Sequence, residues 1–253
     1  MSYLLYCICA TPEKAPYPLP AGVDGQPVRL IENGSLSAVV SVLSARIESL
    51  PRDARSVLVY EKVIETFHRE GAVLPLRYGS LLEEECQVIE HLRQHRQAYL
   101  TTLHELDGCV EMGIRVILEH GKGHTPDARE PCEVSPCATG AEYLAARKDY
   151  FAECDRLRGR GTLVPAQLQE VFAGLFVRCR LESLPPPGSF FRVPVLSLDF
   201  LVKREYEEAF RQTFRTLSQA HSLKMLLSGP WPPHSFASLE KGEEPHATEC
   251  GGE

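Results

Sequence analysis

Histidines and cysteines at short spacings are the first side chains in this sequence that could do chemistry. Four of them, His120, His124, Cys132 and Cys137, lie in one predicted loop, residues 120–139. Two histidines and two cysteines can bind zinc tetrahedrally. Their order and spacing match none of the common structural zinc sites, so the pattern alone does not establish a metal site.

A second histidine pair, His91 and His95, lies four residues apart on a predicted helix, a spacing that can also hold a metal ion. The zinc-protease motif requires a Glu directly after the first His, and Leu92 stands there. Both histidines lie off the apolar stripe of the helix, so we interpret them as solvent-exposed side chains. The sequence contains no Walker A motif and no Gly-x-Ser-x-Gly nucleophile motif, so we expect no enzyme and no cofactor.

A cation and a phenol stand side by side in Leu76-Arg77-Tyr78, within the short apolar segment 73–79. Pro75 interrupts this segment and cannot donate a ladder hydrogen bond, so we predict an edge strand or the end of a strand. Arginine and aromatic side chains are frequent anchors in protein interfaces. The alternative is structural, with Arg77 paired to a carboxylate and Tyr78 filling the core.

The only tryptophan of the chain, Trp231, stands between prolines at Pro230, Pro232 and Pro233. Prolines fix an extended path, which would present the indole ring to a partner. In the alternative interpretation the ring packs in the core between domains, and the proline-rich path clamps the C-terminal segment against the N-terminal half.

Composition excludes several classes of protein. The 253 residues are 43% hydrophobic and 24% charged, which suits one large or two small globular domains. The net charge of -7 argues against a nucleic-acid partner, which would need a basic stripe. We expect no membrane-spanning helix, because no apolar run reaches about 18 residues. The N-terminus lacks the basic region of a signal peptide, so the nine cysteines are expected to be reduced in a cytoplasm.

The elements that position these side chains form two predicted domains, the first over residues 1–107. Asn33-Gly34 between apolar runs is a strong hairpin signal, and Asp53 is a suitable N-cap. The predicted elements are strands at 2–10, 28–31 and 36–42 and helices at 53–70 and 80–106. Together they give an N-terminal α+β domain.

The second predicted domain covers residues 108–236 and is followed by a polar tail, 237–253. Its predicted elements are a strand at 109–119, helices at 140–158 and 164–173, strands at 175–181 and 191–202, a helix at 204–221 and a strand at 223–227. The order β-α-α-β-β-α-β is a ferredoxin-like pattern with one extra helix. The fold class is therefore α+β, with a modified ferredoxin-like C-terminal domain.

Three motifs together resemble those of the gas vesicle protein F/L family. They are Leu74-Pro75-Leu76-Arg77-Tyr78-Gly79, Gly140-Ala141-Glu142-Tyr143-Leu144 and the stretch from Leu226 to Phe236 that contains Gly229-Pro230-Trp231-Pro232-Pro233. The similarity runs from the first strand to Phe236. It departs from the family pattern at His234, where the pattern has Tyr, and the loop 120–139 has no counterpart.

The resemblance implies a two-domain α+β protein that acts in gas vesicle assembly, in the cytoplasm and at the vesicle. The implied partners are the major gas vesicle shell protein and other gas vesicle accessory proteins. Subunits of a gas-holding shell expose apolar patches before assembly, and a soluble protein could cover them. We expect the covering contacts from Leu76, Arg77 and Tyr78 and from the segment Pro230–Pro233.

Two alternatives stay open from the residues alone. A ferredoxin-like domain could sense a small molecule, which is an argument by analogy with the fold. The loop could instead carry a zinc or thiol enzyme, which stoichiometric zinc lost on Cys132→Ser or Cys137→Ser would reveal.

Overall fold

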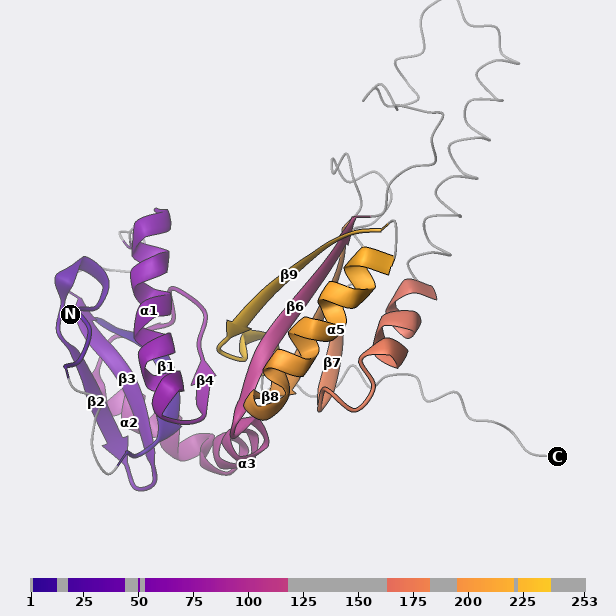
Figure 1. Cartoon of the computed structure of the whole chain (residues 1–253). Helices are drawn as coiled ribbons and strands as arrows, with labels where there is room; N and C mark the ends of the chain where they lie inside the picture. The colour runs from indigo at the N-terminus through magenta and orange to yellow at the C-terminus, as the bar shows by residue number, and fades with distance from the viewer. Residues whose placement is uncertain are drawn as a thin grey trace, which may run out of the picture. The chain divides into compact units, whose positions relative to one another are not determined.

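The computed structural model describes residues 2–12, 18–43, 50, 53–117, 163–182, 195–220 and 223–237. The chain divides into two compact units, each with its own sheet (Figure 1). The first unit contains Met1–Asp107 together with Pro232–Glu253, and the second contains Gly108–Trp231. The described residues 232–237 therefore group with the N-terminal half, whereas the sequence analysis placed residues up to 236 in the second domain.

The first unit contains a five-stranded antiparallel sheet in the order β2-β3-β1-β4, with β5 also paired to β1. The strands are β1 (Ser2–Ala10), β2 (Val28–Asn33), β3 (Leu36–Leu43), β4 (Val73–Pro75) and β5 (Leu81–Leu82), with a short 3-10 turn η1 (Val23–Gly25) before β2. The predicted hairpin is confirmed, because β2 and β3 pair on either side of Gly34. Gly34 has a φ of 65°, which a residue without a Cβ adopts at little cost.

Helix α1 (Ala54–Glu70) covers this sheet and begins at the predicted cap. An Asp53 carboxylate oxygen accepts a hydrogen bond from the Ser56 N–H at 2.9 Å. The inner side of the helix buries Tyr60, Val63, Ile64 and Phe67 in the first core. Burial of each large apolar side chain contributes about 1.5–3 kcal/mol, so this helix is held mainly by packing.

The single helix predicted over 80–106 is wrong. The chain instead forms β5, then α2 (Glu85–Gln94) and α3 (Arg96–Leu106). The break lies at His95, whose φ of −100° and ψ of 10° are not helical. Helix α2 packs on β2 and β3, whereas α3 packs on β1 and β4. One straight helix could not pack on both pairs of strands, so the chain bends between α2 and α3. The spacing of apolar residues in the sequence does not reveal this bend.

A capping box explains why α2 does not start at residue 80. The Glu84 side chain accepts from the backbone of Gln87, and the Gln87 side chain accepts from the Glu84 N–H at 3.2 Å. This pair satisfies two donors at the helix start that would otherwise have no partner.

The second unit contains a four-stranded antiparallel sheet in the order β7-β8-β6-β9. Its strands are β6 (Cys109–Ile117), β7 (Arg178–Glu182), β8 (Val195–Lys203) and β9 (Lys224–Trp231). Strand β8 lies inside the sheet, as its apolar run predicts. The α+β class with antiparallel sheets is thus confirmed, and the strand order is that of a ferredoxin-like fold.

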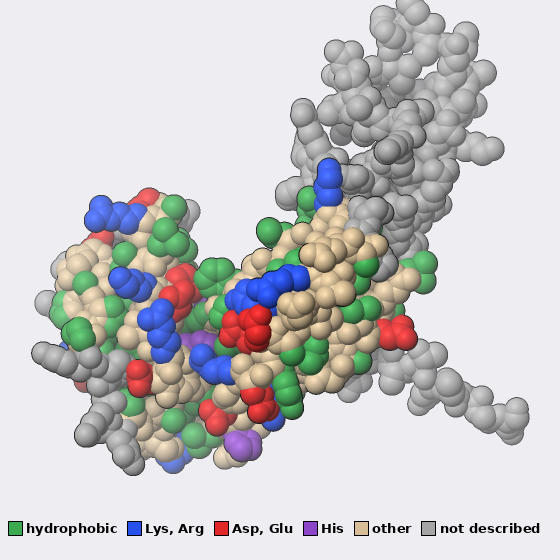
Figure 2. All heavy atoms as spheres, viewed as in Figure 1, with side chains coloured by type: hydrophobic (Ala, Val, Ile, Leu, Met, Phe, Trp, Pro, Cys, Tyr) green, Lys and Arg blue, Asp and Glu red, His purple; other side chains and the backbone are tan. Residues whose placement is uncertain are grey.

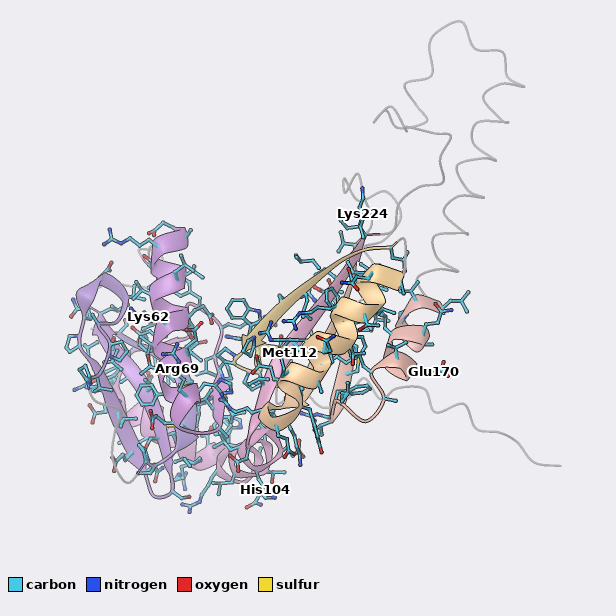
Figure 3. All side chains as sticks on the ribbon, viewed as in Figure 1. Lys62, Arg69, His104, Met112, Glu170 and Lys224 are labelled. Carbon is cyan, nitrogen blue, oxygen red and sulfur yellow. The ribbon has the colours of Figure 1, made fainter. Side chains whose placement is uncertain are left out.

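Two helices lie on the same face of this sheet, α5 (Glu207–Ala220) and a helix at 163–171 (Figure 1). The 3-10 turn η4 (Arg204–Tyr206) leads into α5. Phe172 and Phe210 stack with ring centroids 4.3 Å apart and share the second core with Met112, which is fully buried. Met112 of β6 is labelled in Figure 3. Charged side chains follow the outer side of α5 (Figure 2). The helix predicted at 140–158 lies outside the described residues.

Candidate partner-binding segments

The predicted segment around Arg77 lies at the edge of the first sheet. Strands β4 and β5 both pair with β1, and residues 76–80 form a turn between them, here called the Arg77 turn. The Ser80 N–H donates to the Arg77 carbonyl at 3.0 Å, and Gly79 takes a φ of 96° within this turn. Glycine suits that position because other side chains are strained there. The edge position predicted from Pro75 is confirmed.

Tyr60 of α1 holds the backbone of the Arg77 turn from inside the core. Its hydroxyl lies 2.7 Å from the Leu5 carbonyl oxygen, 3.0 Å from that of Leu76 and 3.2 Å from that of Arg77. Burial raises the pKa of Tyr60 well above its usual value, so the phenol remains a donor. The sequence could not show this role of Tyr60, because a helical pattern of apolar residues does not reveal which distant backbone groups a side chain will meet.

The two neighbours Arg77 and Tyr78 have different environments. The Tyr78 ring meets Tyr60 edge-on with centroids 5.1 Å apart and packs against the first core. Partial burial raises the pKa of Tyr78, and a hydrogen bond with Ser56 opposes that rise. Arg77 is exposed, and within the described part of the chain no carboxylate pairs with it. The structural alternative, in which the side chain serves the packing of the unit, therefore fits Tyr78 but not Arg77. Leu76, the third predicted residue of this segment, is half-buried.

Trp231 belongs to a strand, which corrects the predicted proline-fixed path. Strand β9 was expected to end at Leu227, but it continues to Trp231, which pairs with Glu111 of β6 after an irregularity in the register. Trp231 remains 47% exposed, and Pro230 beside it is exposed. Sheet pairing, rather than proline stiffness, fixes the backbone on which the indole ring is presented.

Arg211 of α5 secures the end of this strand. Its guanidinium donates to the Gly229 carbonyl at 2.8 Å and pairs with Glu207 at 3.0 Å. Gly229 has a φ of 103°, and a Cβ there would lie 2.5 Å from the Glu111 carbonyl oxygen. Only glycine permits this approach, so Gly229 and Arg211 together fix the backbone beside Trp231. No sequence signal indicated the contact of Arg211 with Gly229.

The residues after Trp231 pack within the first unit. Pro232 and Pro233 are buried, and the 3-10 turn η5 (His234–Phe236) follows. His234 Nε2 lies 2.9 Å from Glu61 Oε2 on α1. Burial of the two prolines fits the interpretation in which the proline-rich path holds the C-terminal segment in place. Of the predicted partner-binding residues in this segment, Pro230 and Trp231 are the exposed ones.

His91 and His95 are not the solvent-exposed pair that the sequence suggested. Both are half-buried with ring centroids 4.8 Å apart, and His91 Nε2 is hydrogen-bonded to the Tyr99 hydroxyl at 2.7 Å. Burial, with a smaller effect of His95, lowers the pKa of His91. No group of metal-ligating side chains occurs within the described ranges. The loop candidates His120, His124, Cys132 and Cys137 lie outside those ranges.

Comparison with known proteins decides the family. A sequence profile described as "Gas vesicle synthesis protein GvpL/GvpF" matches residues 2–238. The chain belongs to the GvpL/GvpF family. It is 28% identical over 249 residues to gas vesicle protein L of Streptomyces sp. (strain CB03234), covering 91% of this chain and 90% of that protein. Gas vesicle protein F of the same strain is 27% identical over 225 residues, covering 85% of this chain and 90% of that protein.

Solved GvpF structures share the fold of this GvpL/GvpF chain. GvpF from Anabaena sp. PCC7120 superposes with a TM-score of 0.72 at 17% identity, covering 97% of this chain and 99% of that one. GvpF from Microcystis aeruginosa gives a TM-score of 0.69 at 17% identity, covering 94% and 99%. The family suggested by the sequence motifs is thus confirmed. No helix in the described part of the chain is long and apolar enough to cross a membrane.

Proposed function

We propose that this chain is a gas vesicle assembly factor or minor vesicle component that binds the hydrophobic shell protein and limits its aggregation. Membership in a gas vesicle synthesis family supports a role in gas vesicle formation. The proposal places the protein in the cytoplasm and at the vesicle, in contact with the shell protein and other accessory proteins. It acts by binding, without turning over a substrate.

The observation that carries this proposal is the exposed cation Arg77 on a rigid turn. Tyr60 fixes the carbonyl groups of the turn from the core, and β1 holds both of its ends. A side chain on a backbone that is already ordered loses less entropy on binding, which favours affinity. Arg77 thus has the properties of an interface anchor, with Tyr78 and Leu76 supplying apolar surface beside it.

Trp231 is the second proposed anchor. Its ring is half-exposed although tryptophan usually buries most of its surface, and strand pairing together with Gly229 and Arg211 fixes its backbone. Tryptophan and arginine are the residues most enriched among side chains that dominate binding energy. An apolar shell subunit offers the surface that such a ring would cover.

The proposal is tested by pull-down of the shell protein from gas-vesicle-forming cells, with the full chain as bait. Arg77→Ala and Trp231→Ala should each weaken capture by about tenfold, the equivalent of about 1.4 kcal/mol. Matched controls are Lys62→Ala and Tyr206→Ala, which truncate an exposed cation and an exposed aromatic ring at other places in the two units.

Circular dichroism of each variant separates loss of binding from loss of fold. Normal capture by both Arg77→Ala and Trp231→Ala would show that these anchors are wrong. Unfolding of both would support the packing alternative. Absence of the shell protein from the eluate of the wild-type chain would refute the proposed function itself.

A further inference from the structure

One extra residue interrupts the pairing of β9 with β6 just before Trp231. Trp231 lies opposite Glu111, and Ser228 lies opposite Gly113. Between these two pairs β6 has a single residue, Met112, which is labelled in Figure 3, whereas β9 has two residues. Two residues opposite one define a β-bulge, a feature that can redirect a side chain. This feature is here called the β9 bulge.

The β9 bulge decides on which face of the second sheet Trp231 lies. Side chains alternate between the two faces along a strand, and side chains directly opposite in paired strands share a face. Leu227 packs against the second core, under the helices, so Ser228 belongs to the other face. Regular alternation from Ser228 would bring Trp231 back to the helix-covered face. The extra residue instead places Trp231 opposite Glu111 on the other face, where the ring stays 47% exposed.

Arg211 of α5 holds the backbone of the β9 bulge. The extra residue of a bulge loses its partner in the ladder, and its backbone groups need another one. The carbonyl group of Gly229, the first residue of the bulge, accepts a hydrogen bond from the Arg211 guanidinium at 2.8 Å. Glu207, one turn earlier on α5, orients this guanidinium by accepting from its Nε at 3.0 Å. Arg211 and Glu207 are both half-buried, so water and salt screen their interaction less than that of an exposed pair.

We propose that Arg211 is a positioning residue for Trp231, which fixes the face and the direction in which the ring meets the shell protein by holding the carbonyl group of the β9 bulge. This inference rests on the proposed function and adds the residue that controls one of its two anchors. A ring on a backbone that is already fixed loses less entropy on binding. Loosening the bulge should therefore weaken binding even though Trp231 itself is unchanged.

The alternative is that Arg211 only joins α5 to the sheet and has no influence on the ring. Apolar contacts already hold this helix, because Phe210 is fully buried in the second core and Phe214 and Leu217 pack against that core. Loss of the guanidinium should therefore disturb the bulge more than the helix. A measurement on the ring itself separates the two interpretations.

Fluorescence anisotropy of the full chain measures the motion of this ring alone, because Trp231 is the only tryptophan. Arg211→Met keeps the aliphatic stem and removes the hydrogen bond to Gly229, so it should lower the anisotropy and increase quenching by acrylamide. Arg211→Lys restores a cationic donor and should return both values toward those of the wild type. The matched control is Arg215→Met, one turn further along α5, where the arginine pairs with Glu208 at 3.1 Å. It should leave both values unchanged.

Pull-down of the shell protein, with the full chain as bait, measures the effect on binding. Arg211→Met should lower capture by about tenfold, Arg211→Lys should restore it, and Arg215→Met should leave it unchanged. Glu207→Gln keeps the donor and removes the charge that orients it, so its anisotropy and capture should lie between those of Arg211→Met and the wild type. Circular dichroism confirms that each variant is folded.

The outcomes separate this inference from the proposed function. Lower anisotropy together with lower capture, both restored by Arg211→Lys, supports the inference. Wild-type anisotropy in Arg211→Met, or lower anisotropy with normal capture, overturns the inference and leaves the proposed function standing. If Arg211→Met unfolds, Glu207→Gln decides by the same two measurements, and wild-type values of both overturn the inference. Failure of the wild-type chain to capture the shell protein overturns both.

Discussion

Replacing Tyr60 by Phe removes one oxygen atom from the centre of the first unit. The ring is fully buried, lies 4.9 Å from the Tyr6 ring and would keep its packing in the variant. The hydroxyl is the donor that the carbonyl groups of Leu5 and Leu76 share, at 2.7 and 3.0 Å. The substitution therefore tests one hydrogen-bonding group with almost no change of volume.

The expected cost is that of leaving buried acceptors without their donor. Such a loss lowers the free energy of unfolding by about 1–3 kcal/mol, which is a large part of the stability of a small domain. The assay is urea unfolding followed by far-UV circular dichroism. Trp231, the only tryptophan, lies in the second unit and reports its unfolding separately by fluorescence.

Tyr206→Phe is the matched control, because Tyr206 is exposed on η4. Its effect should stay within about 0.5 kcal/mol, as for most surface substitutions. A Tyr60→Phe variant that unfolds with the same free energy as Tyr206→Phe would refute the reasoning. It would show that the Arg77 turn does not depend on the hydroxyl of Tyr60.

The remaining predictions concern ionisable groups. In NMR titrations His91 should show a pKa below about 6.5, and His95→Gln should raise it by removing a nearby charge. Since folding lowers this pKa, the stability that neutral His91 contributes is present above about pH 6.5 and is lost as the pH falls through the folded value. Glu84→Gln should lower the pKa of the Cys86 thiol and speed its alkylation at pH 8, measured by peptide mapping. His234→Ala should lower stability by about 0.2–1 kcal/mol and speed hydrogen exchange in the C-terminal segment.

Features that depend on neighbours in the chain could be predicted from the sequence. The Asp53 cap, the Asn33-Gly34 turn and the bounds of β1 all appear where the residues indicated. The apolar run of β8 correctly gave an inner strand. Motifs spread along the chain indicated the family. Each of these signals is local, or is a pattern that needs no knowledge of which distant residues meet.

Features that depend on contacts between distant residues could not be predicted. The bend at His95 follows from two helices packing on different strands, and the length of β9 follows from its pairing with Glu111. Contacts between distant residues also decide that His234 pairs with Glu61 and that the segment after Trp231 packs in the first unit. A periodic pattern shows that a residue has a buried side but not what covers it.

The sequence thus established the α+β class, most of the elements and the family of this protein, because hydrophobic period, capping and turn chemistry act over a few residues. Only the folded chain decided that Arg77 is exposed beside an inward-facing Tyr78, and that Trp231 of β9 lies opposite Glu111 of β6. Strand register brings these residues together across gaps in the chain, and register is set by the packing of whole sheets.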